Sequence, residues 1–447
     1  MTGSASGRGR YSGRDVGGAF VMLIGVAVIG SGLVFNPVVA RLWQGVYAID
    51  KADVLLSYCL WALVLGAAII WTGAAFASAA PGGRADRALI LVLPLSLLFL
   101  GDRFLLVEMG LPLWTHDTEL HYRHRPNITR TLARAGRPND VISINRHGHH
   151  DTDYPVEKPP GEFRALMIGD SITMGDQLPY EATFSAQLEA LLAERGGGAH
   201  TGYQIINTGV HGYATYQEAM VLEESMRFEP DFVAIGFCMN DLTDPSVVKR
   251  GFDGAAVDYH RVAPTSNPIQ GYLLNDTGIG RLAQRILARG RSKSAEQRNE
   301  LEDVRRVATS PDDPEVAKAY SFVLKDLEGM YETALSHDVP VLLVIFPFTF
   351  QLLEEDARAP QRILREHAEG LGIPVLDLTE PFARLVYDDP EVVGLLQQKG
   401  YTADQIEQFY GWRMREYFLD SDHLTTKGHA VVAEALLDHL TSSGAIR

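Results

Sequence analysis

Cysteine is almost absent from this chain, because its 447 residues include only Cys59 and Cys238. Two cysteines are too few for a disulfide framework or a cysteine-rich zinc site. Positive charge is also scarce, since 40 Lys and Arg stand against 56 Asp and Glu and leave a formal net charge of −16. A nucleic-acid-binding protein favours the opposite balance. The charged fraction of 21% and hydrophobic fraction of 46% exclude a disordered, collagen-like or coiled-coil chain.

Most of the hydrophobic excess lies before residue 110. Val16–Ala40 and Val54–Gly83 carry no charge, and each exceeds the roughly 20 residues that a membrane-spanning helix needs. A third stretch, Ala88–Met109, contains three charged residues and either spans the membrane or lies on its surface. We predict a basic tail over 1–15 and a transmembrane block over 16–109, with helices at 16–40, 54–80 and 88–109.

Basic residues in the short loops predict how these spans are oriented. The N-terminal tail holds Arg8, Arg10 and Arg14, and the second loop holds Arg84 and Arg87. The first loop, on the other side of the membrane, holds only Arg41 and Lys51. This favours an inner N-terminus, so three spans place the chain after residue 110 outside the cytoplasm. Five arginines between Arg123 and Arg137 oppose this, but long domains translocate largely regardless of charge. We expect a multi-pass protein of the cell (inner) membrane that contacts membrane lipid and has a periplasmic or extracellular domain.

Short apolar runs alternate with helical periodicity after about residue 160. The runs predict strands at 164–168, 203–206, 232–237, 341–346 and 375–378. Helices are predicted at 180–194, 215–226, 316–336, 360–371 and 426–441. This alternation indicates an α/β domain over 161–447 with a parallel sheet covered on both faces, preceded by a linker or lead-in over 110–160. An insert over 243–315 contains a charged stretch at Arg281–Arg306. This stretch is interpreted as a solvated helix or mobile loop, or else as a lid or a binding surface for an acidic polymer.

Four polar segments follow predicted strands and therefore fall on the carboxyl edge of the sheet, where α/β proteins bind ligands. They are Gly169-Asp170-Ser171, Asn207–Gly212, Asn240-Asp241 and Asp420–His423. A nucleophilic serine needs a histidine base and a carboxylate that orients it. A glycine N–H and an asparagine amide can stabilise the oxyanion. Each segment alone also fits a turn or a helix cap, so their joint placement carries the prediction.

This set of motifs resembles the SGNH hydrolase family, also called GDSL esterases and lipases, over about residues 160–441. The resemblance implies a flavodoxin-like three-layer sandwich. It makes Ser171 the nucleophile, with Asp420 and His423 as acid and base. The oxyanion donors are then Ser171, Gly212 and Asn240. The chain departs from the family pattern at Cys238, where a glycine is frequent, and at Ile172-Thr173, where the eponymous leucine is replaced.

The resemblance implies acyl transfer through an acyl-enzyme, with no metal or organic cofactor. We expect a serine esterase that cleaves O-acyl esters, acetyl esters first of all, on a cell-envelope glycan or glycolipid. The same triad would also serve an O-acyltransferase, which passes the acyl group to a sugar hydroxyl. A third reading is an inactive module that binds glycans. Neither a nucleic-acid partner nor a particular protein partner is predicted.

Several other polar residues are weaker candidates for the chemistry. Asp422 lies beside His423 and could replace Asp420 as the orienting acid, but the family spacing favours Asp420. His429 is interpreted as a helix residue. A histidine-rich segment could ligate a metal, but it fits no fixed zinc motif and is interpreted as a polar loop: His147, His149 and His150 beside Asp151 and Asp153.

Overall fold

A computed structural model describes residues 13–34, 62–77, 101–102, 113–131, 141–243, 277–280, 293–387 and 399–446, with short gaps inside some of these ranges. The chain divides into two compact units. One comprises Met1–Pro112 and Asn267–Leu287, and the other comprises Leu113–Ser266 and Ala288–Arg447. Most of the predicted spans 54–80 and 88–109, and the end of 16–40, lie outside the described residues. Within the part that is described, no helix has the length and apolarity needed to cross a membrane.

The first unit contains helix α1 (Gly13–Val34), which packs closely against helical residues 65–74. Glycines spaced seven apart meet at this contact, Gly18 and Gly25 on α1 facing Gly73 and Gly66. A Cβ atom on Gly18 would lie 2.6 Å from the Gly73 carbonyl oxygen, so the backbones approach more closely than larger residues would allow. Large apolar side chains on both segments are exposed, among them Phe20, Leu23 and Trp71.

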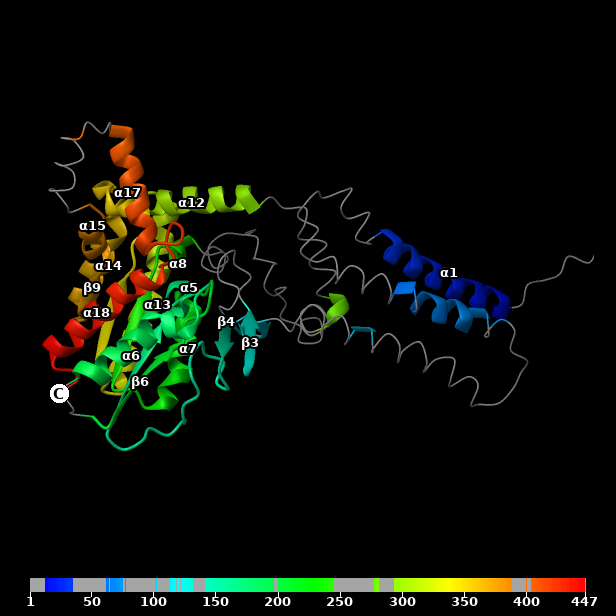
Figure 1. Ribbon diagram of the computed structural model, residues 1–447, viewed down its shortest axis with the longest axis horizontal. Coiled ribbons are helices and arrows are strands. Elements are labelled where there is room, and N and C mark those ends of the chain that lie inside the picture. Colours follow the sequence, from blue (N-terminus) through cyan, green and yellow to red (C-terminus); the bar gives the residue numbers. More distant parts are fainter. Residues whose placement is uncertain are drawn as a thin grey trace, which may run out of the picture. The chain divides into compact units, whose positions relative to one another are not determined.

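A five-stranded parallel sheet forms the centre of the second unit, in the order β6-β5-β7-β8-β9 (Figure 1). The strands are β5 (Glu162–Ile168), β6 (Gly202–Asn207), β7 (Phe232–Phe237), β8 (Val341–Ile345) and β9 (Val375–Asp377). They confirm the five predicted strands to within two residues at each end. The strand order reverses at β5, and α/β proteins bind ligands at such a switch point, outside the carboxyl ends of the strands.

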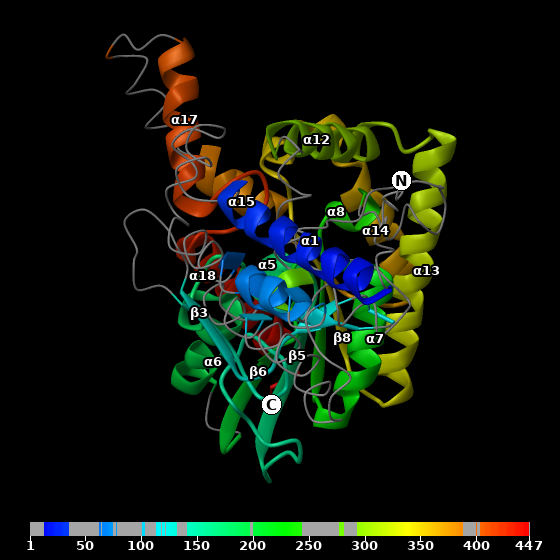
Figure 2. The ribbon, with the colours of Figure 1, turned by 90° about the vertical axis from the view of Figure 1, so that its right-hand side faces the viewer.

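Helices cover both faces of this sheet, as predicted (Figures 1 and 2). Helix α6 (Phe184–Arg195) packs with α18 (Thr426–Ser443) on one face, and α7 (Thr215–Ser225) packs with α13 (Pro314–Ser336) on the other. Helix α14 (Ala359–Gly370) contacts β9. Helix α6 begins later than predicted because the Thr183 side chain caps it, accepting from the Ala186 N–H at 3.3 Å.

Further helices complete the second unit. They are α5 (Ser171–Met174), α8 (Asn240–Thr243), α12 (Lys293–Thr309), α15 (Thr379–Tyr387) and α17 (Ala403–Tyr417), with 3-10 turns at Tyr180–Ala182, Met226–Phe228, Thr349–Leu352 and Glu355–Ala357. Helix α12 occupies the charged part of the predicted insert, which agrees with the interpretation of that part as a helix. Most of the remainder of the insert lies outside the described residues.

The lead-in segment forms two antiparallel hairpins and is more than a linker. Strand β1 (Trp114–His116) pairs with β2 (Tyr122–His124), and β3 (Ile128–Thr131) pairs with β4 (Val141–Ile144). The first hairpin is bonded to the loop after β6. The Tyr122 hydroxyl donates to the carbonyls of His211 and Gly212 at 2.9 Å each, and the Tyr213 hydroxyl donates to the Tyr122 carbonyl.

The arginine of β5 lies wholly inside the second unit. Arg164 on β5 is fully buried, and its guanidinium pairs with Glu162 at 2.7 Å. The guanidinium also donates to the carbonyls of Val156 and Phe228 at 2.9 and 3.0 Å. A buried charge requires such partners, so Arg164 ties β5 to the lead-in and to the turn before β7.

Candidate active site

Ser171 sits at the carboxyl end of β5, where the chain turns sharply into α5. The turn requires Gly169, because a Cβ atom there would lie 2.2 Å from Thr173 Oγ1. Asp170 caps α5, accepting from the Ile172 N–H at 2.9 Å. The Ser171 hydroxyl is thereby placed at the first turn of a short helix, at the switch point of the sheet.

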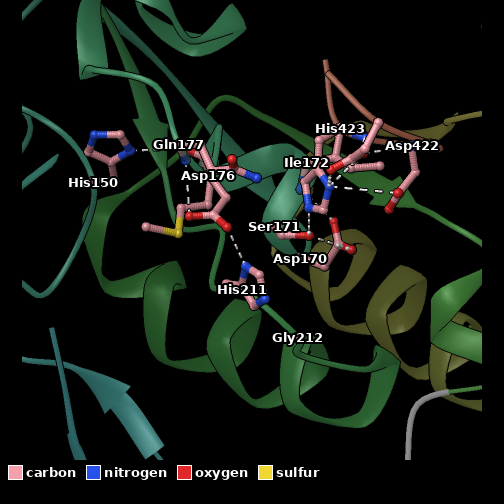
Figure 3. Close-up of polar contacts among 12 residues, drawn as sticks. His150, Asp170, Ser171, Ile172, Asp176, Gln177, His211, Gly212, Asp422 and His423 are labelled. Atoms are coloured by element: carbon pink, nitrogen blue, oxygen red, sulfur yellow. Dashed lines mark hydrogen bonds and ion pairs between the residues drawn. The ribbon is translucent and has the colours of Figure 1, made fainter. Parts of the chain in front are cut away.

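His423 and Asp420 lie on the segment between α17 and α18, and His423 meets Ser171 there (Figure 3). The Nε2 atom of His423 is 2.9 Å from Ser171 Oγ. Both carboxylate oxygens of Asp420 lie 3.0 Å from His423 Nδ1, and one of them also accepts the His423 backbone N–H at 2.9 Å. The nearer Asp422 oxygen is 3.6 Å from Nδ1 and accepts from the Ser421 hydroxyl. Asp420 is therefore the better placed to orient the imidazole.

The charges around His423 favour its protonated form. Burial lowers the pKa of His423, but the carboxylates of Asp422, Asp420 and Asp176 outweigh it and raise the pKa to about 10. Burial raises the pKa of Asp420, but the hydrogen bond to His423 prevails and lowers it to about 2. Burial raises the pKa of Asp422 to about 6. Near neutral pH the imidazole must therefore lose a proton before it can act as a base.

Asn240 and Gly212 reach the same edge of the sheet from the neighbouring strands. The Asn240 side-chain amide donates to Asp170 Oδ2 at 2.7 Å, which fixes its orientation and leaves a second N–H on the same nitrogen. Gly212 has a φ of 71° and lies on the loop after β6, beside His211 (Figure 3). The His211 ring stacks on the His423 ring, with centroids 6.1 Å apart. His423 thus contacts Ser171 directly, Asn240 is bonded to the neighbouring Asp170, and the loop of Gly212 reaches His423 through the His211 ring.

Sequence reasoning missed two contributors to this site. Asp170 caps the start of α5 and also accepts a hydrogen bond from the Asn240 amide. In the sequence it is noticeable only as the middle residue of Gly169-Asp170-Ser171. Asp176 and His211 form a second carboxylate–imidazole pair, with 2.6 Å between Asp176 Oδ2 and His211 Nδ1. The signal available in the sequence was that Asp176 and His211 are polar residues on the loops that come after β5 and β6, the first two strands of the central sheet.

The other residues considered from the sequence make contacts within the fold and do not belong to the Ser171–His423–Asp420 line. His429 lies on α18, and its Nδ1 accepts the Phe184 N–H at 3.0 Å. Burial lowers the pKa of His429 to about 3, so the ring is neutral. Cys238 is buried in the core, and its N–H donates to Asp241. In the histidine-rich segment, His147 bonds the Tyr154 carbonyl and His150 the Met174 carbonyl, so these rings point to separate partners.

A parallel α/β sheet with a Ser–His–Asp arrangement at its carboxyl edge defines a protein of the serine hydrolase type. Residues 167–431 match the GDSL-like lipase/acylhydrolase family, and the chain belongs to that family. No curated protein matches the chain.

Solved structures of low sequence identity are also similar. A lipolytic G-D-S-L family protein from Veillonella parvula is 14% identical, with 62% of this chain and 98% of that chain covered and a TM-score of 0.31. A catalytic mutant of an acetylxylan esterase from Geobacillus stearothermophilus is 16% identical, with 62% and 94% covered and a TM-score of 0.34. A hydrolase from a Lake Arreo metagenome is 17% identical, with 64% and 96% covered and a TM-score of 0.35.

Proposed function

We propose that the chain is a serine esterase that acts through an acyl-enzyme on Ser171. The observation that carries the proposal is the continuous line of contacts from Ser171 Oγ through His423 to Asp420, at 2.9 and 3.0 Å. In the neutral imidazole, Asp420 accepts the Nδ1 proton, which leaves Nε2 as the acceptor for the serine proton. Family membership supports ester hydrolysis as the class of reaction.

The reaction has two halves. The Nε2 atom of His423 removes the Ser171 proton while Oγ attacks the ester carbonyl, and the imidazolium then gives that proton to the leaving alcohol. The N–H groups of Ser171 and Gly212 and the Asn240 amide are the proposed donors to the oxyanion. Water then attacks the acyl-enzyme and releases the acid. No step requires a metal or an organic cofactor.

The proposed substrates are O-acyl esters, acetyl esters above all, on a cell-envelope glycan or glycolipid. This choice of substrates is supported by the predicted location of the catalytic unit on the periplasmic or extracellular side of the membrane. An acyltransferase with the same triad is the alternative, because the second half-reaction accepts any hydroxyl that reaches the acyl carbon. Adding a glycan acceptor distinguishes the two, since only a transferase passes the acyl group to the glycan faster than to water.

The first experiment is the release of acid from aryl acetate and longer aryl esters by the full-length protein in detergent. Ser171→Ala is the control. Hydrolysis that disappears in Ser171→Ala supports the esterase, and the chain-length profile separates acetyl from fatty-acyl preference. Equal activity of both proteins contradicts the proposed nucleophile. Glycan binding without turnover by either protein would favour the inactive binding module.

We also propose that the N-terminal unit attaches the catalytic unit to the cell (inner) membrane. Support comes from the charge-free runs of sequence and from helices that meet through glycines and expose large apolar side chains, an arrangement typical of helices packed in lipid. A reporter fused after residue 447 tests the sidedness. A cytoplasmic signal would contradict a periplasmic or extracellular catalytic unit, and recovery of the protein in an alkaline-washed supernatant would contradict membrane attachment itself.

A further inference from the structure

The Asp176–His211 pair lies on the side of His423 away from Asp422 (Figure 3). One ligand atom from each of Asp176, His211 and His423 lies within 4.8 Å of the other two. Neither Asp176 nor His211 belongs to the Ser–His–Asp line of contacts, and each lies on a loop that follows a different strand. Three polar groups thus converge on one point next to Ser171.

The spacing of these groups suits an oxygen atom. With one atom from each group within 4.8 Å of the others, an oxygen can lie at ordinary hydrogen-bond length, about 2.8 Å, from both Asp176 and His423, while the Nδ1 proton of His211 is donated to Asp176. A metal ion fits less well, because Asp176 Oδ2 and His211 Nδ1 are 2.6 Å apart. Two ligand atoms of one tetrahedral zinc ion are separated by about 3.3 Å, given metal–ligand bonds of about 2.0–2.1 Å. The pair is therefore built for a water or a hydroxyl group.

Asp176 is held in place by the turn that follows α5. Its N–H donates to the Ser171 carbonyl at 2.9 Å, so it moves together with the nucleophile. Its Oδ1 accepts the Gln177 N–H at 3.0 Å. Gln177 has a φ of 71°, a conformation that is strained for a residue with a side chain and that clusters at functional sites.

His211 is fixed just as firmly. Its carbonyl accepts from the Tyr122 hydroxyl, and its ring lies between the rings of Trp114 and His423, with centroid separations of 6.4 and 6.1 Å. Because a carboxylate only accepts hydrogen bonds, the Nδ1 atom of His211 carries the proton that Asp176 binds. The side chain is half-buried.

We propose that Asp176, oriented by His211, binds together with His423 the oxygen that attacks the acyl-enzyme in the second half-reaction. The inference rests on the proposed esterase mechanism. The attacking O–H gives its proton to His423 Nε2 while the oxygen bonds to the acyl carbon. The bond between that carbon and Ser171 Oγ then breaks, and the proton passes from His423 to Oγ. The carboxylic acid leaves and Ser171 is regenerated.

Kinetics with an activated aryl acetate test this assignment, because they separate the two half-reactions. The value of kcat/KM reports acylation alone, whereas kcat falls when the acyl-enzyme is consumed slowly. We expect Asp176→Asn and His211→Ala to lower kcat and KM together by about 10- to 100-fold, the effect of losing a hydrogen bond to a charged or reacting group. The value of kcat/KM should stay within about threefold of the parent value. Intact-protein mass spectrometry should show acetylated Ser171 accumulating.

Two controls make the test specific. Glu223→Gln makes the same carboxylate-to-amide change on the exposed face of α7 and should change neither constant. His211→Gln keeps a polar group near the ring position and should restore part of the kcat that His211→Ala loses. Rates are compared on the alkaline plateau of each variant's pH profile, so that a change in the protonation of His423 does not enter.

Each result decides between distinct conclusions. Unchanged kcat in both variants overturns the inference and leaves the esterase intact. An equal fall in kcat/KM and kcat, with no acyl-enzyme, also overturns it, because that pattern means general damage to the site. Absence of both hydrolysis and acylation in the parent protein contradicts the proposed function itself.

Discussion

Replacing Asp422 by asparagine should move the pH profile of the enzyme toward lower pH. The kcat/KM value for an aryl acetate requires neutral His423, and the carboxylates around this histidine raise its pKa. A raised pKa keeps the base protonated over a wider pH range, so activity should increase with pH and reach half its maximum above pH 6.5, the usual value for histidine. The Asp422→Asn substitution would remove one of the charges responsible.

The size of the shift follows from the distance. Asp422 Oδ1 lies 3.6 Å from His423 Nδ1. At that distance a unit charge contributes about 1 kcal/mol in a water-like dielectric and about 4–5 kcal/mol at an effective dielectric of about 20. Since about 1.4 kcal/mol corresponds to one pH unit, the midpoint should fall by about one to three units. Asp422 is largely buried, which places the expectation toward the upper part of that range.

The assay is kcat/KM for an aryl acetate between pH 5.5 and 10, corrected with Ser171→Ala for spontaneous hydrolysis. Asp420→Asn is the matched control. Because Asp420 bonds directly to Nδ1, its loss should lower kcat by about 10³- to 10⁴-fold across the range rather than merely move the midpoint. A midpoint that stays in place or rises in Asp422→Asn would refute the electrostatic reasoning. Equal losses in both variants would refute the assignment of Asp420 as the orienting acid.

Three further variants test other parts of the structure. Asp170→Ala removes the acceptor of the Asn240 amide and the cap of α5, so kcat/KM should fall about 10- to 100-fold; an unchanged value would show that Asn240 needs no such support. Tyr122→Phe deletes the hydroxyl bonded to the loop of His211 and Gly212, and should lower stability in urea unfolding by about 1 kcal/mol and also reduce kcat. Arg164→Met breaks a buried ion pair and should destabilise by about 3–5 kcal/mol. The exposed pair Arg195–Glu434 provides its control, because Arg195→Met should cost at most about 1 kcal/mol.

The sheet and its helices could be predicted from the sequence because burial leaves a strong signal. Strand β7 (Phe232–Phe237) is buried along its whole length, and its apolar run has the same bounds as the strand. The lead-in hairpins were not predicted, because strands of three or four residues such as Tyr122–His124 show too little alternation. Their pairing depends on tertiary contacts with the loop after β6.

The triad was predicted for a different reason, namely its match to a family pattern. Residues outside that pattern gave no comparable signal. Asp176 and His211 are 35 positions apart, and their contact exists only because β5 and β6 lie side by side and end at the same edge. Likewise, the link from Asp170 to Asn240 spans 70 positions and crosses from β5 to β7. Pairings of this kind follow from the assembled sheet and not from local sequence.

The distance along the chain between Ser171 and His423 has a consequence for biosynthesis. The two residues are 252 positions apart, and His423 comes just before α18, which packs against α6. At about 5–20 residues per second, a ribosome delivers the base roughly 10–50 s after the nucleophile. Throughout that interval the growing polypeptide carries a serine without its proton acceptor. Esterase activity should therefore begin only when synthesis is nearly complete.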